Sequence, residues 1–465
     1  MAYTFSRSPE QVPSVATEHR KIASPIPAPG TAEVLARLER VESRSMHGQL
    51  PIVWDRAEDF SVFDLAGNKF IDFTSTIFVA NVGHSNQKVS DAIRLTLDKP
   101  LYSSYAYANE IRAEYLEQLL DFAGPPFEKA FLLSAGTEAT EAALKLMRMN
   151  GAAKGKRRLG VICIEGNWHG RTMGAQLMSS NPAQREWIGF TDPDIHHIPF
   201  PYPWLPESSD GARFLREGLR RLEDDGLVLG TDVCGFMLET FQGWGAVFYP
   251  ESFVQEIESL CEEHEIMLAF DEMQSGFART GKAFGYQHYG VTPDLLCCGK
   301  GMGGGVPLSG VIGRGEVMDL PEVGNMSSTH SANPLVCAAG LAVLEEIADR
   351  SLIDESRRKG EVLAEGLERI CKQHPRRLKH LSGHGLIGSL LFFDPQSDAP
   401  DTTLASKVAE LCMRKGLLVV HTGRESIKLG PPLTISDQAL VEGLAVLEES
   451  VNELCVESTV AGGTR

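Results

Sequence analysis

The stretch Asp294–Gly310 reads DLLCCGKGMGGGVPLSG, and the rest of the chain is organised around it. Its four apolar residues Leu295–Cys298 have the length and composition of a buried strand. Lys300 follows after one glycine and precedes the glycine-dense loop Gly301–Gly305, where the backbone can approach a bound group closely. The pattern therefore predicts a lysine at the end of a buried strand, beside a flexible loop.

Lys300 in such a place has the surroundings that a Schiff-base lysine needs. Loss of water favours the neutral amine over the ammonium, and the neutral amine is the form that attacks an aldehyde. The alternative is an ordinary solvated lysine in a loop, which is the commoner case for a lysine considered alone. A nucleotide-binding P-loop is excluded, because Gly301 stands where it needs Ser or Thr and Asp294 where it needs glycine.

Length and composition limit the class of protein. A chain of 465 residues exceeds the size at which one core usually stops growing, so two or more lobes are expected. The net charge of −18 argues against a nucleic-acid partner, and no apolar run is long enough to predict a membrane partner. Nine cysteines without a CxxC pair predict free thiols in a reducing compartment, the cytoplasm, and no metal site.

The order of patterns along the chain indicates the fold class. The first 30 or so residues are rich in Pro, Ser and Ala and predict an extended arm that packs on another surface or stays mobile. From Lys129 onward, short apolar runs alternate with helical patterns, which predicts an α/β fold whose mostly parallel sheet is covered on both faces. A final helix is expected over Asp437–Val451, followed by a frayed tail.

Ligands of an α/β sheet bind beyond the carboxyl ends of the strands, so polar residues directly after apolar runs are the site candidates. Ser134, Gly136 and Thr137 follow one such run and open a strongly helical segment. Free amides at a helix N-terminus, with a glycine that permits close approach, form a phosphate cup. The alternative interpretation is a well-capped helix without a ligand.

Two further strand ends carry candidate residues. Trp168 offers a flat face for stacking on an aromatic ring and Arg171 a fork for a carboxylate, although a tryptophan in a turn also fits a core position. Asp271 follows the apolar run Met267–Phe270, where a carboxylate is costly unless it meets a cation such as a protonated pyridine nitrogen. A helix N-cap is the other role open to Asp271.

Six segments, taken together and in order, resemble the class III (ω-type, subgroup II) aminotransferases, pyridoxal-phosphate enzymes of fold type I similar to 4-aminobutyrate aminotransferase. The segments are LLSAGTEATEAALKLMR, NWHGRT, ETFQGWGAVFYP, DEMQSGFARTGKAFGYQHYGVTPDLLCCGKGMGGGVPLSG, STHSANPLVCAAG and PPLTIS. The resemblance implies a large cofactor-binding domain over 86–345. A smaller α+β domain would be built from 346–465 and from part of 1–85, which also holds the N-terminal arm.

The resemblance also implies a set of cofactor contacts. By family position they are Ser134, Gly136, Thr137, Trp168, Glu239, Asp271, Met273, Gln274, Lys300 and Thr329. Lys300 would hold pyridoxal 5'-phosphate as an internal aldimine and act as the base, and Asp271 would pair with the pyridinium nitrogen. Gln274 would bond the ring hydroxyl, while Trp168 and Met273 would pack on the two ring faces.

The implied reaction is transfer of an amino group from an amine or ω-amino acid donor to a keto acid, by a ping-pong aldimine/ketimine mechanism. Thr329 would reach the phosphate from the partner subunit, which implies a homodimer with the active site at its interface, or a dimer of dimers. The alternatives are a decarboxylase or aminomutase of the same fold, or a non-catalytic cofactor-binding scaffold. The presence of both Lys300 and Asp271 argues against the scaffold.

Substrate residues follow from the same resemblance. They are Ile77, Phe78, Arg171, Glu239 and Lys428. Ile77 and Phe78 would line the entrance, Arg171 would bind a distal carboxylate, and Glu239 would pair with a gating arginine when a dicarboxylate is absent. Lys428 stands where relatives carry arginine, and a lysine cannot offer a bidentate fork. Arg424 and Arg171 are therefore the alternative carboxylate binders.

Overall fold

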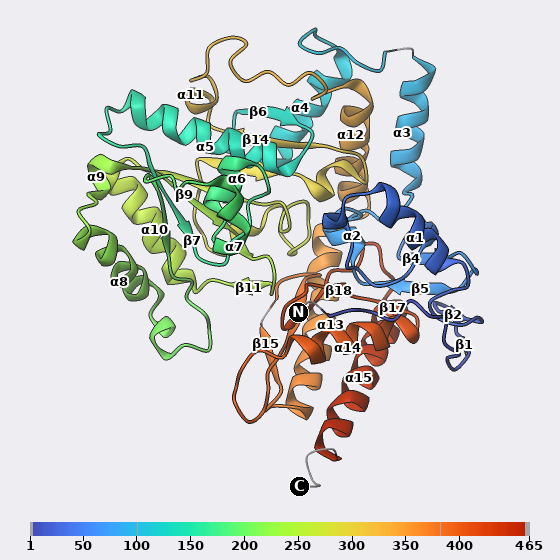
Figure 1. The fold of residues 1–465 in the computed structure, drawn as a ribbon. Helices are drawn as coiled ribbons and strands as arrows, with labels where there is room; N and C mark the ends of the chain where they lie inside the picture. Colours follow the sequence, from blue (N-terminus) through green and yellow to red (C-terminus); the bar gives the residue numbers. More distant parts are fainter. Residues whose placement is uncertain (1–2, 100, 382, 461–465) are drawn as a thin grey trace. The chain divides into compact units, whose positions relative to one another are not determined.

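The computed structural model describes residues 3–99, 101–381 and 383–460, and it divides into two compact units. Unit 1 comprises Met1–Asn86, Trp244–Ala246 and Asp354–Arg465, and unit 2 comprises Gln87–Gly243 and Val247–Ile353. Figure 1 shows the elements of both units. Over the described ranges, no helix combines the length and the apolar character needed to cross a bilayer.

A seven-stranded sheet forms the centre of unit 2, in the order β6-β14-β13-β12-β9-β7-β8. Its strands are β6 (Lys129–Leu133), β7 (Gly160–Ile164), β8 (Ile195–Ile198), β9 (Val233–Glu239), β12 (Met267–Asp271), β13 (Leu295–Cys298) and β14 (Ser309–Gly313). The pairs β7/β8, β7/β9, β9/β12 and β12/β13 are parallel, and β14 is antiparallel to both its neighbours. The expected mostly parallel sheet is confirmed by this pairing, and the central strands β7, β9, β12 and β13 are buried along their whole length.

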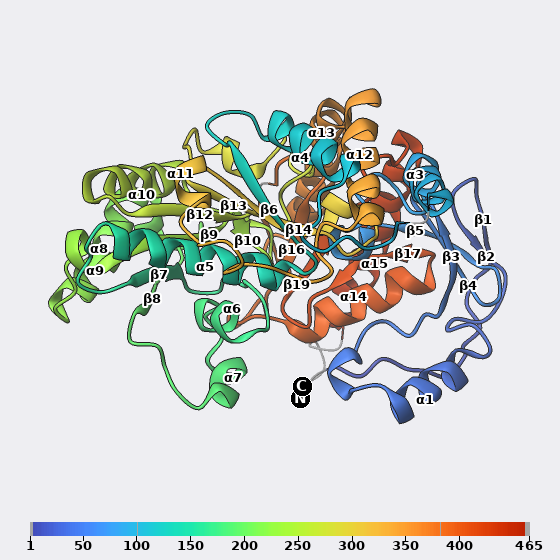
Figure 2. The same ribbon diagram turned by 90° about the horizontal axis from the view of Figure 1, so that it is seen from above.

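Helices cover both faces of this sheet. Figures 1 and 2 show α5 (Gly136–Ala153) on one face and α10 (Glu251–His264) on the other. The remaining α-helices of unit 2 are α3 (Gln87–Asp98), α4 (Glu110–Ala123), α6 (Met173–Met178), α7 (Pro182–Arg185), α8 (Gly211–Asp224), α9 (Leu229–Asp232), α11 (Gly315–Met318) and α12 (Pro334–Asp349). Met147 on α5 packs in the same buried cluster as Met237 and Ala269, which fixes the helix on the sheet.

The register of the central strands aligns their carboxyl ends. Asp271 at the end of β12 lies opposite Glu239 at the end of β9 and opposite Cys297 near the end of β13. Lys300 follows Cys297 by three residues, at the start of the short 3-10 helix Lys300–Gly303. A short hairpin, β10 (Phe241–Gln242) and β11 (Val247–Phe248), continues from β9. Two carboxylates and the lysine thus share one edge of the sheet.

Unit 1 contains two sheets. The first has the order β1-β2-β5-β4-β3, with β17 (Leu417–Leu418) also paired to β5; its other strands are β1 (Val15–Ala16), β2 (Lys21–Ile22), β3 (Trp54–Glu58), β4 (Ser61–Asp64) and β5 (Lys69–Asp72). The second has the order β15-β16-β19-β18, with strands β15 (Leu378–Leu381), β16 (Gly388–Phe392), β18 (Val420–His421) and β19 (Ser426–Leu429). The N-terminal arm packs within its own unit, since Ile22 and Ile26 share a buried cluster with Phe70.

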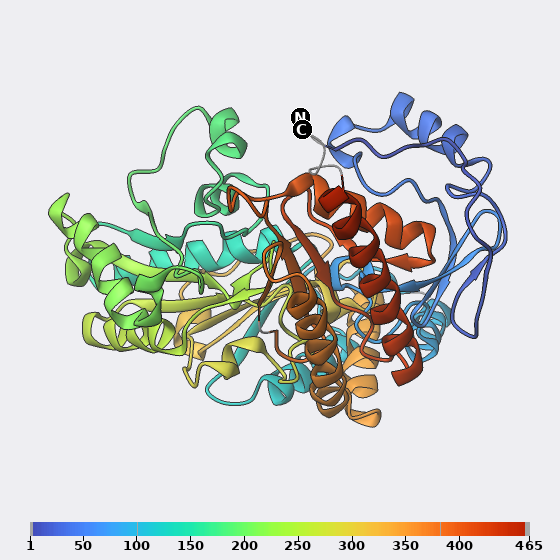
Figure 3. The same ribbon diagram turned by 90° about the horizontal axis from the view of Figure 1, so that it is seen from below.

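The long helices of unit 1 lie mostly in the C-terminal part of the chain (Figure 3). They are α1 (Thr31–Val41), α13 (Leu352–Gln373), α14 (Thr402–Arg414) and α15 (Asp437–Val460). The final helix was expected to end at Val451 and to be followed by a frayed tail. This expectation is wrong, because the helix continues to Val460. The physical reason is that no glycine or proline lies between Val451 and Gly462, so this stretch carries no stop signal. Residues 461–465 of the expected tail lie outside the described residues.

The segment α2 (Ser75–Phe78) is a single turn of left-handed helix. The φ angles are 44° at Ser75, 52° at Thr76, 61° at Ile77 and 68° at Phe78, and none of the four residues is glycine. A left-handed conformation costs an L-residue about 1–2 kcal/mol, and a β-branched residue is rare there. Such strain persists only where surrounding contacts enforce it.

Candidate active site

The backbone conformation and the burial of Lys300 are both unusual for a lysine. Its φ of 49° is left-handed although it is not a glycine, so the loop forces the lysine into a strained conformation. Burial lowers the pKa of its ammonium, while the nearby carboxylates of Asp271 and Glu239 act in the opposite direction. Lowering of the pKa by lost hydration is what makes a lysine available as a neutral amine.

Asp271 is buried and held in a fixed orientation. Its Oδ1 accepts a hydrogen bond of 3.0 Å from the backbone N–H of Met273, and its Oδ2 lies 3.0 Å from His169 Nδ1. A carboxylate can only accept, so Nδ1 of His169 is the nitrogen that carries the proton. His169 belongs to the NWHGRT segment, and its contact with Asp271 was not expected from the sequence.

His169 is itself pinned by its backbone. Its N–H donates to Ser179 Oγ at 2.8 Å, and its carbonyl accepts from Thr140 Oγ1 at 2.7 Å. The imidazole is buried, and its Nε2 has no hydrogen-bond partner within the described part of the chain. His169 therefore fixes Asp271 through one nitrogen only. The sequence signal that could have predicted this role is a histidine that follows a buried strand and stands two residues before Arg171.

Glu239 is the second carboxylate at this edge. Its Oε2 accepts from the backbone N–H of Trp168 at 3.0 Å and of Gly243 at 3.3 Å, and its Oε1 from Gln274 Nε2 at 3.4 Å. Burial and, secondarily, the Asp271 carboxylate raise the pKa of Glu239 to about 7. Glu239 thus ties Trp168 to Gln274 and titrates near neutral pH.

Glu272, the next residue after Asp271, has a structural role. It is fully buried and accepts hydrogen bonds from Thr240 Oγ1 at 2.7 Å and Ser275 Oγ at 2.6 Å. Two backbone amides, those of Gly285 and Tyr286, complete its surroundings at 2.8 and 2.6 Å. Glu272 therefore closes the loop after β12 and leaves Asp271 as the acid at the strand end.

The amino end of α5 carries the residues of the predicted phosphate cup. The Glu138 carboxylate accepts from the backbone N–H groups of Ser134 and Ala135 at 2.9 and 2.8 Å, which shapes the turn before the helix. The hydroxyls of Thr137 and Thr172 lie 2.6 Å apart. The helix N-terminus at Gly136 presents its first amides and the positive end of the helix dipole, as an anion requires.

Met273 packs between the cup and the lysine loop. A Cβ added at Gly136 would lie 2.8 Å from Met273 Sδ, and one added at Gly299 would lie 2.6 Å from the same sulfur. A side chain at either glycine would therefore require Met273 to shift. Met273 therefore lies close both to the start of α5 and to the residue that precedes Lys300.

Trp168 and Arg171 lie together. The Arg171 guanidinium carbon is 4.4 Å from the centre of the Trp168 ring, a cation–π distance. Arg171 is exposed and Trp168 is half-buried. The indole is thus supported on one side by the guanidinium, whose fork remains accessible to solvent.

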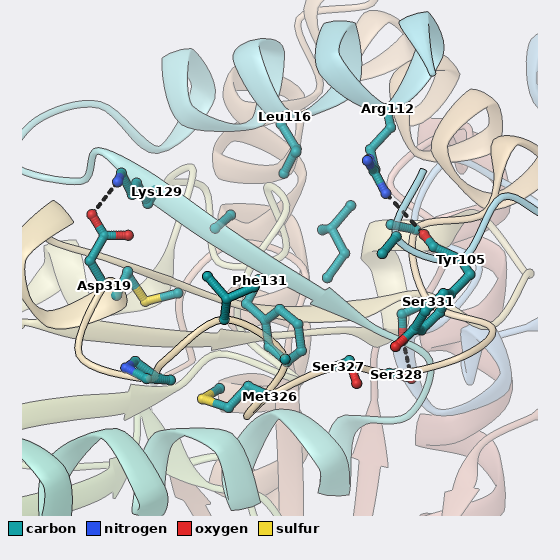
Figure 4. Close-up of a pocket in the computed structure, with 18 of the residues that line it drawn as sticks. Tyr105, Arg112, Leu116, Lys129, Phe131, Asp319, Met326, Ser327, Ser328 and Ser331 are labelled. Carbon is teal, nitrogen blue, oxygen red and sulfur yellow. Dashed lines mark hydrogen bonds and ion pairs between the residues drawn. The ribbon is translucent and has the colours of Figure 1, made fainter. Parts of the chain in front are cut away.

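Thr329 lies on the exposed loop that precedes α12. Its neighbours Ser327, Ser328 and Ser331 line a cavity of about 570 Å³, together with Tyr105 from the segment before α4. Figure 4 shows this cavity with β6 and α4 as its walls. The remaining predicted substrate residues, Ile77, Phe78 and Lys428, belong to unit 1.

The chemistry of this edge fits pyridoxal phosphate. The group needs an amine for its aldehyde, a carboxylate for its ring nitrogen, a flat side chain for its ring and amides for its phosphate. The described part of unit 2 contains one group of each kind, in Lys300, Asp271, Trp168 and the α5 N-terminus.

Comparisons with known proteins agree with this geometry. Residues 43–451 match the family described as Aminotransferase class-III. The 5-aminovalerate aminotransferase DavT of Pseudomonas aeruginosa is 34% identical over 415 residues, covering 88% of this chain and 95% of the relative. The 4-aminobutyrate aminotransferase GabT of Escherichia coli is 32% identical over 434 residues, covering 90% and 98%. The acetylornithine aminotransferase of Caldanaerobacter subterraneus is 31% identical over 413 residues, covering 88% and 96%.

Solved structures show the same fold. An aminotransferase from Bacillus anthracis aligns with a TM-score of 0.82 at 25% identity and covers 91% of this chain and 98% of its own. The ornithine aminotransferase of Toxoplasma gondii aligns with a TM-score of 0.80 at 25% identity, covering 92% and 96%. The α/β fold with its mixed sheet is fold type I of the pyridoxal-phosphate enzymes. The chain belongs to the class-III aminotransferase family, whose members are pyridoxal-phosphate-dependent transaminases that use amino donors and keto acid acceptors.

Proposed function

We propose that this transaminase takes an ω-amino acid as its donor and that Lys300 is both the covalent anchor of the cofactor and the base. The observation that carries the assignment of Lys300 is its place at the strand ends with Asp271 and Glu239, where burial lowers its pKa. The neutral Lys300 amine would hold the cofactor through its aldehyde carbon, and Lys300, once free of the cofactor, would accept the proton from the donor carbon.

The other residues of unit 2 receive orienting roles. The cofactor, when bound, supplies a sink for the electron pair left on the donor carbon. Asp271, held by His169, would keep the ring nitrogen protonated, and Gln274, tied to Glu239, would bond the ring hydroxyl. Ser134, Gly136 and Thr137 would bind the phosphate at the helix N-terminus.

The proposal of an ω-amino acid donor rests on the side chains that could bind the donor's carboxylate. Arg171 holds an exposed guanidinium over Trp168, where a carboxylate distant from the reacting amine could bind its fork. Relatives act, by their names, on 4-aminobutyrate and 5-aminovalerate, both ω-amino acids. Ile77, Phe78 and Lys428 are assigned to the substrate side of unit 1.

Two measurements test these assignments. Borohydride reduction followed by peptide mapping is expected to find the cofactor on Lys300, and its presence on any other lysine would contradict the anchor. A panel of ω-amino acids, α-amino acids and simple amines is expected to show fastest bleaching of the visible cofactor band with an ω-amino acid. Carbon dioxide release would instead indicate a decarboxylase.

We also propose a homodimer in which Thr329 reaches the partner's phosphate cup. Its support is the exposure of Thr329, on a loop beside a cavity lined by Ser328 and Ser331. Sedimentation of the full chain, whose mass is 50.8 kDa, would report a dimer, or a dimer of dimers.

Units 2 and 1 correspond in this proposal to the cofactor-binding and small domains. The cytoplasm is the proposed compartment, supported by the nine free thiols.

A further inference from the structure

The hydroxyl of Thr137, a residue assigned to the cofactor phosphate, is contacted by the loop between β7 and α6. It lies 2.6 Å from the Thr172 hydroxyl, and it accepts a hydrogen bond of 3.3 Å from the backbone N–H of Thr172. A Cβ added at Gly170 would overlap Thr137 Oγ1, so the Thr137 side chain lies against bare backbone. The position of this hydroxyl is therefore set by the loop as well as by α5.

The Thr172 hydroxyl has a second neighbour, which fixes the direction of its proton. It donates to Oε1 of Glu141, four residues after Thr137 on α5, at 2.6 Å. The same carboxylate oxygen accepts from the backbone N–H groups of Gly174 and Ala175 at 2.8 and 3.1 Å, which anchors it at the start of α6. A carboxylate only accepts and a hydroxyl has one proton, so the proton of Thr172 points to Glu141.

The direction of the bond between the two threonine hydroxyls follows from this. Because Thr172 gives its proton to Glu141, its oxygen can only accept from Thr137, and the Thr137 hydroxyl is the donor of the 2.6 Å bond. Thr137 Oγ1 then has only a lone pair for any other neighbour. A phosphate monoester carries nearly two negative charges at pH 7 and binds through acceptor oxygens, so a hydroxyl in this state does not bind it.

The backbone of Thr137 differs from its hydroxyl in this respect. Gly136 and Thr137 are the first two residues of α5. The first N–H groups of a helix have no acceptor within the helix, and together they attract an anion. The backbone N–H of Thr137 can therefore donate to a phosphate although its hydroxyl cannot.

We propose that Thr172 is a positioning residue: held by Glu141, it turns the Thr137 proton away from the cofactor phosphate, so that Thr137 binds the phosphate through its backbone alone. The proposal rests on the proposed place of the phosphate at the start of α5. Its effect is greatest for the aminated form of the cofactor, which has no aldehyde for Lys300 and is held by noncovalent contacts only. Thr172 and Glu141 thus limit how tightly this form is retained between the two half-reactions.

Thr172→Val tests the proposal by removing the hydroxyl while keeping the shape of the side chain. Thr172 is exposed, so the change buries no new surface, and the Thr137 hydroxyl becomes free to form a charge-assisted hydrogen bond with the phosphate. Calorimetry on the full-length apoprotein is expected to give an about tenfold lower Kd for pyridoxamine 5'-phosphate in this variant. The Kd of pyridoxamine, which lacks the phosphate, should stay the same.

Two further variants serve as controls for Thr172→Val. Thr172→Ser keeps the hydroxyl and should bind pyridoxamine 5'-phosphate as the native chain does. Thr191→Val changes an exposed threonine before β8 and should alter neither Kd. An equal gain in either control would show that the effect does not come from the Thr172 hydroxyl, and the proposal would be overturned.

Substitution of Thr137 shows whether the gain passes through its hydroxyl. Thr137→Val should leave the Kd of pyridoxamine 5'-phosphate within about twofold of the native value, and the tenfold gain should disappear when Thr137→Val and Thr172→Val are combined. Weaker binding by Thr137→Val would show that the hydroxyl does bind the phosphate. That result, a gain that survives in the double variant, or no gain in Thr172→Val overturns the proposal.

Thr137→Asp separates this inference from the proposed place of the phosphate. A carboxylate at position 137 should repel the phosphate and raise the Kd of pyridoxamine 5'-phosphate about a hundredfold, with little effect on pyridoxamine. If the Kd does not rise, the phosphate lies elsewhere, and the proposed phosphate cup fails together with the inference. If it rises while Thr172→Val has no effect, only the role of Thr172 fails.

Discussion

At the scale of single residues, the site depends on how each charged group is neutralised or held. Asp271 is positioned by His169 on one side and by a backbone amide on the other. Glu239 is held by two amides and a glutamine, and burial brings its titration into the neutral range. Substitution of a residue that holds Asp271 or Glu239 should therefore alter the reaction at Lys300, although that residue does not itself react.

Replacing His169 should weaken the hold on Asp271. His169→Ala leaves a buried carboxylate with one hydrogen bond fewer, a loss of about 1–3 kcal/mol, so kcat is expected to fall about tenfold or more. The pKa of the visible cofactor band, followed by absorbance against pH, should shift in the same variant. His288→Ala serves as the control, because His288 contacts the Thr280 carbonyl rather than Asp271. Equal effects of the two changes would contradict this role.

The titration of Glu239 predicts a pH dependence of stability. Its pKa is raised to about 7 in the folded chain, above the ordinary carboxyl value, so the folded state holds a proton that the unfolded state has lost. The free energy of unfolding should therefore fall by up to about 2–3 kcal/mol as pH rises from 4.5 to 7. Urea unfolding at several pH values should show this slope, and Glu239→Gln should flatten it. An unchanged slope in the glutamine variant would contradict the prediction.

At the scale of elements, the parallel strands were predictable and the loops between them were not. Short apolar runs such as Leu295–Cys298 are typical of buried strands, and the sheet rule then places Asp271 and Lys300 at strand ends. The contact of His169 with Asp271 depends on the path of a loop between distant strands. Likewise, no local pattern predicts that Ser75–Phe78 adopts left-handed angles, because their intrinsic preference is right-handed or extended.

Relieving the strain of α2 should stabilise the chain. Thr76 is exposed with φ at 52°, and glycine adopts this conformation without steric cost, so Thr76→Gly should raise the free energy of unfolding by about 1 kcal/mol. Thr96→Gly in the right-handed helix α3 should lower it by about 1 kcal/mol. Chemical denaturation of the two variants provides the comparison. Destabilisation by both substitutions would show that the turn is not strained at Thr76.

At the scale of the whole molecule, the division of the chain into a cofactor-binding domain and a smaller domain was predicted from the family resemblance. The family match extends over residues 43–451 and so includes segments from both units. Composition alone suggested several lobes but could not show that the first 86 residues and the last hundred share one unit. Such pairing at long sequence separation is decided by tertiary contacts.

Mixing two inactive subunits tests the proposed shared site. Lys300→Ala lacks the anchor, and Thr329→Ala lacks the phosphate contact offered to the partner. A hybrid dimer would contain one complete site, so an equal mixture after subunit exchange should recover about a quarter of native activity. Each variant alone supplies the control. Recovery no greater than the average of the two separate preparations would contradict a contribution of Thr329 across the interface.

The pairing of β5 with β17 has a consequence for synthesis of the protein. Ile71 and Asp72 on β5 lie opposite Leu417 and Leu418, 346 residues later in the chain (417 − 71 and 418 − 72). At translation speeds of about 5–20 residues per second, the emerging β5 waits roughly 20–70 s on the ribosome for this neighbour. Unit 2, made almost entirely of the intervening chain, can fold during that interval. An unpaired strand edge exposed for this long is a natural client for a nascent-chain chaperone.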